Sequence, residues 1–118
     1  MKTILLTIIV SLIISTTYSQ TFVYNFVTYT VTSTTNNTVE TTDYNTAGGT
    51  TVNIPSTVTD PSTNTTYTVT AIGGHSLRND NLTNVTLPNG ITRIGEYAFI
   101  ANNLNNIVIP NGVTSIGT

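Results

Sequence analysis

The sequence contains no cysteine, and charged residues make up only 7% of its 118 residues. Without cysteine, no disulfide can staple the fold, no thiolate can bind zinc, and no lipidated cysteine can tether the chain after export. Stability must therefore come from packing. Positive charge is also scarce, because Lys2, Arg78 and Arg93 are the only basic side chains besides one histidine. Two scattered arginines and one N-terminal lysine cannot neutralise a phosphate backbone, so we expect no nucleic-acid partner.

A hydrophobic run long enough to span a bilayer is missing as well. Residues 4–14 form an apolar stretch of 11 residues, whereas a membrane-spanning helix needs about 20. Lys2 precedes the stretch, and the small residues Thr17 and Ser19 follow it at the spacing of a cleavage site. This pattern is typical of a secretory signal peptide over residues 1–19, with a retained membrane anchor as the alternative. We expect a secreted or cell-surface chain that starts at Gln20 and carries no transmembrane anchor.

Residues 20–50 are rich in Thr, Asn, Val and Tyr and alternate with a period of two, which predicts a β-rich N-terminal segment. Residues 26–32 and 38–44 flank Asn36-Asn37, a pair that tolerates positive φ, so a hairpin is expected. A Thr-rich disordered linker is the alternative. Six aromatic residues argue against it, because disordered segments are usually poor in aromatics: Phe22, Tyr24, Phe26, Tyr29, Tyr44 and Tyr67.

Three further strands are predicted before residue 70. Residues 51–54 form a short strand that ends at Pro55. Residues 57–59 and 66–69 bracket a turn at residues 60–64, whose Asp, Pro, Ser and Asn predict a second hairpin.

An internal repeat of 22 residues follows. Residues 81–95 align without a gap to residues 103–117, with nine of the 15 positions identical and three more exchanging Val, Ile or Leu. Residues 69–73 match residues 91–95, which lie 22 positions later, so they form the second half of an earlier repeat unit. Residues 52–55 resemble residues 85–88, although they lie 33 residues before them, so the second hairpin is interpreted as an 11-residue insertion in the first coil.

The repeat predicts a mainly β fold, a solenoid of 22-residue coils with short parallel strands, over residues 51–118 and about two and a half coils. Residues 84–87 form the expected strand, and matching strands of successive coils are expected to pair in parallel. Pro88 ends the strand, Asn89-Gly90 forms a turn, and Gly95 closes a second bend. The expected core residues are Ile72, Leu82, Val85, Leu87, Ile91, Ile94, Phe99, Leu104, Ile107, Ile109, Val113 and Ile116.

Residues 82–99 carry the pattern Leu-x-x-Val-x-Leu-Pro-x-x-Ile-x-x-Ile-Gly-x-x-Ala-Phe. This pattern resembles the BspA-like, or Treponema-type, leucine-rich repeats, and the resemblance extends over residues 69–118. Gly74-His75-Ser76-Leu77 departs from it, because the family usually has Ala-Phe there. The resemblance implies a secreted or surface-exposed protein, in several family members connected with adhesion to host proteins or other cells. It identifies no ligand.

No catalytic centre, metal site or cofactor is expected. His75 is the only histidine, and no metal-ligand spacing surrounds it. His75, Ser76 and Asp80 include the residue types of a catalytic triad, but Tyr97, Ala98 and Asn102 occupy the same positions 22 residues later. Positions that vary between repeats of one scaffold are typical of surface or packing, so the chain is interpreted as a non-enzyme.

The functional hypothesis is a binding or adhesion module for a protein or another host or cell-surface ligand, which meets the outward side chains of successive strands. These residues are Thr83, Asn84, Thr86, Asn105, Asn106 and Val108. The alternative is a structural spacer or cap for another domain beyond residue 118. An ice-binding or carbohydrate-binding row of hydroxyls is disfavoured, because the only threonine row that the repeats keep is Thr70, Thr92 and Thr114. We expect a longer protein, because the last coil has nothing to cover it.

Overall fold

The computed structural model describes residues 19–118, so the predicted signal peptide lies outside the described residues except for Ser19. The described chain consists of short strands joined by turns, with one 3-10 helix. In chain order the elements are β1 (Thr21–Tyr24), β2 (Val27–Ser33), β3 (Thr38–Tyr44), η1 (Thr46–Gly48), β4 (Thr51–Asn53), β5 (Thr57–Thr59), β6 (Thr66–Ile72), β7 (Asn84–Thr86), β8 (Arg93–Ile94) and β9 (Ser115–Ile116).

Two hairpins open the described chain, because β1 pairs antiparallel with β2 and β2 pairs antiparallel with β3. The second is the hairpin predicted around Asn36-Asn37, and Asn37 has the positive φ that was expected there, 51°. The expectation that Phe26 begins a strand is wrong. Asn25 and Phe26 form the turn between β1 and β2, with φ values of 45° and 65°. A bulky residue where glycine is usual hides this turn from the sequence pattern.

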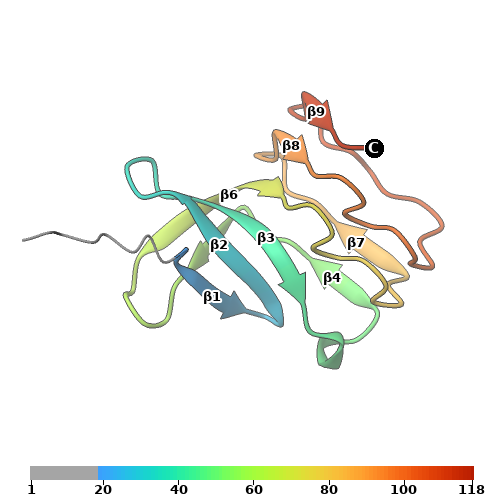
Figure 1. Cartoon of the computed structure of the whole chain (residues 1–118), viewed down its shortest axis with the longest axis horizontal. Helices are drawn as coiled ribbons and strands as arrows, with labels where there is room; N and C mark the ends of the chain where they lie inside the picture. The colour runs from blue at the N-terminus through green and yellow to red at the C-terminus, as the bar shows by residue number, and fades with distance from the viewer. Residues whose placement is uncertain (1–18) are drawn as a thin grey trace, which may run out of the picture.

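A seven-stranded sheet runs through most of the chain in the order β1-β2-β3-β6-β8-β9, with β5 also paired to β6 (Figure 1). The antiparallel pairing of β5 with β6 confirms the second predicted hairpin. β3 pairs in parallel with β6, on the edge opposite β5 and β8. The hairpin of β2 and β3, called the N-terminal hairpin below, therefore covers the edge at which the ladder of repeats begins. This is the role of a capping element in a repeat protein.

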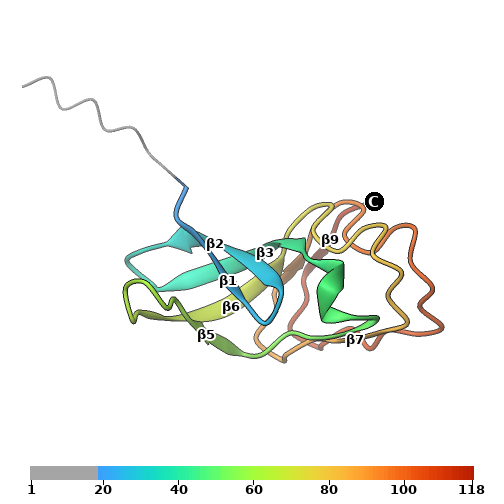
Figure 2. The ribbon, with the colours of Figure 1, turned by 90° about the horizontal axis from the view of Figure 1, so that it is seen from below.

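The 22-residue period becomes a parallel ladder in β6, β8 and β9. Ile72 pairs with Ile94, and Ile94 pairs with Ile116. After each isoleucine comes a glycine, and the N–H of Gly95 donates to the carbonyl of Ile72 at 2.7 Å. A Cβ at Gly95 would collide with the backbone of Gly74, so glycine is needed for the close approach of successive coils. Figure 2 shows these coils stacked as successive loops beside the N-terminal strands.

A second parallel pair, β4 with β7, forms a separate two-stranded sheet. Val52 pairs with Val85, 33 positions apart, which confirms that the β5–β6 hairpin is inserted into the first coil. Buried side chains from both sheets and the loops between them form the core. At its N-terminal end the ring of Phe22 packs against Tyr29 and Tyr67, with centroid distances of 5.8 and 5.7 Å.

The last turn departs from the expected pattern. The repeat predicts a strand at residues 106–108 parallel to β7, but in the described residues β7 pairs with β4 alone and residues 106–108 form no strand. None of the described residues forms a further coil against this turn, and the exposed fraction rises from 3% at Ile94 to 58% at Ile116. The five core residues expected here are therefore only partly buried (Leu104, Ile107, Val113) or exposed (Ile109, Ile116).

The other expected core residues lie in the first two coils. Ile72, Leu82, Val85, Ile91 and Ile94 are buried. Leu87 and Phe99 are partly buried and pack against the same cluster.

Candidate functional site

The outer side of the β4–β7 sheet carries four short, uncharged polar side chains. Val52 and Val85 point inward and are buried, whereas the residues on either side of them are exposed. The register places Thr51 beside Asn84 and Asn53 beside Thr86. Alternation in the strands therefore produces two rows of hydroxyl and amide groups that face solvent.

A groove of about 270 Å³ lies beside β7, on the side away from β4. Its lining comes from β7 and the residues that follow it, together with the matching segment one repeat later: Asn84, Val85, Thr86, Leu87, Asn89, Asn106, Ile107, Val108 and Pro110. None of these residues is charged. Val108 is the most exposed large apolar side chain among the described residues, at 81%. The groove thus combines an apolar wall with amide and hydroxyl groups.

The backbone of β7 adds polar groups to this groove. The carbonyl of Thr86 accepts a hydrogen bond from the N–H of Ile54 at 3.0 Å, so the peptide groups of Thr86 face β4. Peptide groups of successive strand residues point to opposite sides. The N–H and carbonyl of Val85 are therefore directed toward the groove, where no strand pairs with β7 in the described residues.

Four of the six predicted ligand-facing residues line this groove: Asn84, Thr86, Asn106 and Val108. The other two, Thr83 and Asn105, are exposed but lie outside its lining. The Thr83 hydroxyl donates to the carbonyl of Thr50 at 3.3 Å, which ties it to the preceding coil.

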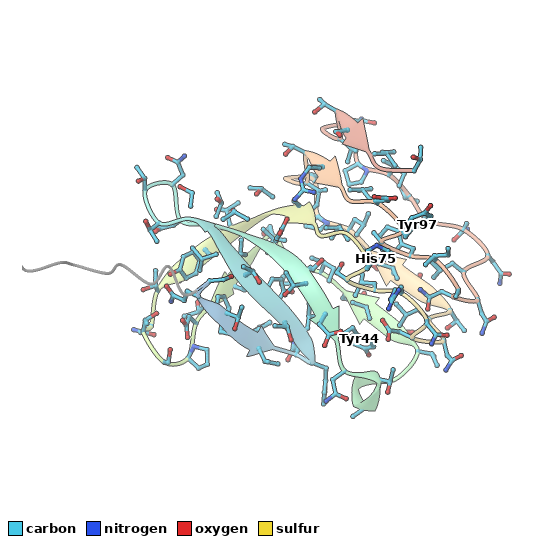
Figure 3. All side chains as sticks on the ribbon, in the orientation of Figure 1. Tyr44, His75 and Tyr97 are labelled. Atoms are coloured by element: carbon cyan, nitrogen blue, oxygen red, sulfur yellow. The ribbon has the colours of Figure 1, made fainter. Side chains whose placement is uncertain are left out.

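His75 and Tyr97 occupy the same position in successive coils and pack against each other (Figure 3), with ring centroids 5.3 Å apart. Both have positive φ, 59° and 52°, and both are exposed. The His75 N–H donates to the carbonyl of Glu96 at 2.9 Å, which links the two loops through the backbone as well. This arrangement accounts for His75 as part of the stacking between coils.

The three residues with triad chemistry have separate surroundings. The Ser76 hydroxyl is buried and lies 2.9 Å from the hydroxyl of Thr41, so it is not available to a substrate in solvent. Burial raises the pKa of the Asp80 carboxyl, and the nearby charge of Asp43 raises it further. His75 packs on Tyr97. The geometry therefore provides no activated nucleophile from these side chains.

Asn102 is a structural residue that the sequence interpretation missed. Its Oδ1 accepts hydrogen bonds from the N–H groups of Asp80 and Leu82, both at 3.0 Å. Its Nδ2 donates to the carbonyls of Leu77 and Phe99. One amide side chain thus satisfies four backbone groups across two coils. The signal available in the sequence was that Asn102 takes the position that Asp80 has one repeat earlier. One such exchange does not show that the amide has a structural role.

Two negative observations concern residues 19–118. No three or more histidine or acidic side chains there come together as a metal site would require. None of the helices in this part of the chain has the length and apolar character needed to cross a bilayer.

Comparison with known proteins points to one repeat family. Residues 61–118 match the family model whose description is "BspA type Leucine rich repeat region (6 copies)". The fold is similar to the crystal structure of a leucine rich cell surface protein from Faecalibacterium prausnitzii A2-165. The TM-score is 0.67 and the identity 26%, over 85% of this chain and 27% of that one. This chain therefore spans about a quarter of the length of that protein.

A leucine-rich repeat protein from Bacteroides capillosus ATCC 29799 shares the fold as well. The TM-score is 0.57 and the identity 20%, over 85% of this chain and 98% of that chain. No curated protein matches this sequence.

Proposed function

We propose that this chain is a non-catalytic protein-binding module of a secreted or cell-surface adhesion protein, because residues 61–118 match the model of the BspA-type leucine-rich repeat family. The similar Faecalibacterium protein is described as a cell surface protein. The observation that carries the proposal is the uncharged groove beside β7, together with the exposed polar rows of β4 and β7.

The groove has the composition of a protein-binding anchor site. Leu87, Ile107 and Val108 offer apolar area for a partner's side chain, and such buried anchors contribute most of the binding energy in protein interfaces. Asn84 and Asn106 offer amide donors and acceptors at the same place. The peptide group of Val85 adds a main-chain donor and acceptor, which an extended segment of a partner would meet.

A charge placed in the groove tests this proposal. Thr86→Arg puts a long cation into a lining without any acidic residue, and Thr34→Arg makes the same change at an exposed position of the β2–β3 turn. Purified protein is measured by biolayer interferometry against immobilised extracellular-matrix proteins and bacterial surface proteins. We expect at least one protein to bind, and Thr86→Arg to weaken that binding by about tenfold or more, which corresponds to about 1.4 kcal/mol.

Thr34→Arg should bind like the parent chain. The proposal fails if no protein on the array binds, or if Thr86→Arg and the parent bind every partner equally.

Export is tested separately by mass spectrometry of the N-terminus. We expect exported protein to begin at Gln20, because residues 1–19, with their apolar stretch over residues 4–14, have the length and flanking residues typical of a signal peptide. A membrane-bound chain that still begins at Met1 would contradict the proposed secretion.

A further inference from the structure

A second hollow lies where the N-terminal strands meet β4 of the first coil, and none of its lining residues lines the groove beside β7. Its volume is about 200 Å³, and it is lined by the turn between β1 and β2, by η1 and by β4. The residues that matter are Asn25, Phe26, Tyr44, Gly48, Thr51 and Asn53. We propose that this hollow binds one neutral sugar ring of a glycan, with the aromatic ring of Phe26 as the stacking platform. The groove beside β7 is not part of this site, although Thr51 and Asn53 also belong to the exposed polar row of β4 described above.

The first argument is the conformation of Phe26. Asn25 and Phe26 have φ values of 45° and 65°, a turn in which the second position usually holds glycine. A bulky residue with positive φ is a genuine outlier and is strained. Burial offsets this strain only in part, because 48% of Phe26 is exposed to solvent. The fold therefore keeps a strained, half-exposed aromatic residue at a position where glycine is usual, as binding sites do.

The position of the ring is also fixed. Gly48 in η1 packs so closely on Phe26 that a Cβ there would lie 2.9 Å from its Cβ and Cδ2 atoms. Tyr44, which is labelled in Figure 3, also lines the hollow, and its hydroxyl donates to the carbonyl of Gly49 at 3.0 Å. Rigid aromatic rings lose little conformational entropy when a ligand stacks on them.

Polar groups that suit sugar hydroxyls surround this ring. Asn25 and Asn53 bring amide side chains, which donate and accept hydrogen bonds. The carbonyl of Thr50 and the N–H of Ile54 are bonded to β7, so the alternate peptide groups of Thr51 and Asn53 are directed away from β7, toward the hollow.

The chemistry and size of the hollow select the ligand class. A pyranose ring has an apolar C–H face for an aromatic ring and equatorial hydroxyls for amide and peptide groups. No charged residue lines the hollow, which favours a neutral sugar over a sialic or uronic acid. A volume of about 200 Å³ equals about seven water molecules, which is the scale of one monosaccharide.

Replacement of the strained residue gives a sharp test. Phe26→Gly removes the stacking ring and relieves the strain, so we expect sugar binding to weaken at least tenfold while Tm stays the same or rises. Tyr97→Gly is the matched control, because Tyr97 is also half-exposed, at 45%, and has a φ of 52°, but lies outside the hollow. Asn53→Ser shortens one amide and should weaken binding several-fold without touching Phe26.

The probes are methyl glycosides of glucose, galactose, mannose and N-acetylglucosamine, and their linear tetrasaccharides. Saturation-transfer NMR detects binding to the purified protein, and calorimetry measures it. We expect saturable binding of at least one neutral sugar, retained in Tyr97→Gly and in Thr86→Arg. The proposal is overturned if none of the sugars binds, if Phe26→Gly binds as well as the parent, or if Tyr97→Gly loses binding equally. Sugar binding that persists in Thr86→Arg would show that this site works independently of the proposed protein-binding groove.

Discussion

The hydroxyl oxygens of Thr41 and Ser76 lie 2.9 Å apart in the interior, where both side chains are almost completely buried. Thr41 belongs to β3 of the N-terminal hairpin, and Ser76 belongs to the first repeat loop. Both the carbonyl and the hydroxyl of Thr41 also accept from the N–H of Gly73, at 2.9 and 3.3 Å. This contact joins the N-terminal hairpin to the first coil through buried polar groups as well as through the sheet.

Thr41→Val should therefore destabilise the whole described fold. The variant keeps the shape of the side chain but leaves the Ser76 hydroxyl buried without a partner, at a cost of about 1–3 kcal/mol. The double variant Thr41→Val with Ser76→Ala removes both hydroxyls, so its loss should be smaller than the sum of the two single losses. Urea unfolding of the four proteins measures this coupling. Losses that simply add would show that the two hydroxyls do not interact.

Ile94→Asp should unfold the repeat ladder. Ile94 is 3% exposed and pairs with Ile72 and Ile116, so a carboxylate there would be buried among apolar side chains. We expect a loss of about 4 kcal/mol or more in the free energy of unfolding. Arg93→Gln is the control, since it removes only the exposed ion pair with Glu40, worth about 1 kcal/mol or less. Equal melting temperatures for Ile94→Asp and the parent would refute the register.

Asn102→Leu should cost about 2–4 kcal/mol, because two N–H groups and two carbonyls lose their partner and recover only part of that energy from water. Asn102→Asp keeps the acceptor for Asp80 and Leu82 but loses the donor to Leu77 and Phe99. Thermal unfolding should thus rank the parent above Asn102→Asp, and Asn102→Asp above Asn102→Leu. If Asn102→Leu were as stable as the parent, the four hydrogen bonds of Asn102 would not contribute to the stability of the fold.

Asp80→Asn should stabilise the protein at neutral pH. Burial, followed by the charge of Asp43, raises the pKa of Asp80 above its ordinary value of 3.8. The folded state therefore favours the protonated carboxyl. The stability that this preference contributes is fully present below the pKa of the unfolded state and is lost as the pH rises through the pKa of the folded state. Melting curves should show a higher Tm for Asp80→Asn at pH 7 and little difference at pH 3. A Tm difference that grows toward low pH would contradict a raised pKa for Asp80.

The fold shifts the pKa of Asp60 in the opposite direction, so its substitution should have the opposite effect on stability. Hydrogen bonds from the Ser62 hydroxyl and N–H, and from the Gln20 side chain, lower its pKa. Its contribution is present above the unfolded pKa and lost as the pH falls through the folded pKa. Asp60→Asn should therefore lower the Tm at pH 7, and the deficit should shrink in acid.

The parts of this fold that could be predicted from sequence are those with local or periodic signals. The repeat phase of Ile72, Ile94 and Ile116 predicts their stacking, because identical positions of successive coils must coincide. Asn36-Asn37 marks its hairpin by its tolerance of positive φ. The 33-residue offset between Val52 and Val85 reveals the inserted hairpin before any coordinates are known.

The features missed from sequence depend on contacts between distant residues or on a strained residue. The pairing of β3 with β6 joins segments that share no pattern. The turn at Asn25-Phe26 lacks the glycine that marks such turns. Residues 106–108 align with the strand residues 84–86 one repeat earlier, but whether a strand forms also depends on its neighbours in the sheet, which one repeat cannot show. The groove beside β7 follows from this missing strand, so sequence could indicate four of its residues but not its shape.

The protein-binding groove is tested most directly by amide hydrogen exchange, measured on the chain alone and bound to the strongest protein partner from the array. The N–H of Val85 is directed into the groove, and residues 106–108 form the opposite wall. We expect binding to slow exchange at Val85 and across residues 106–108, with exchange unchanged in the His75–Tyr97 loops. Protection confined to those loops or to the N-terminal hairpin, with Val85 unaffected, would contradict the account and place the partner on another surface.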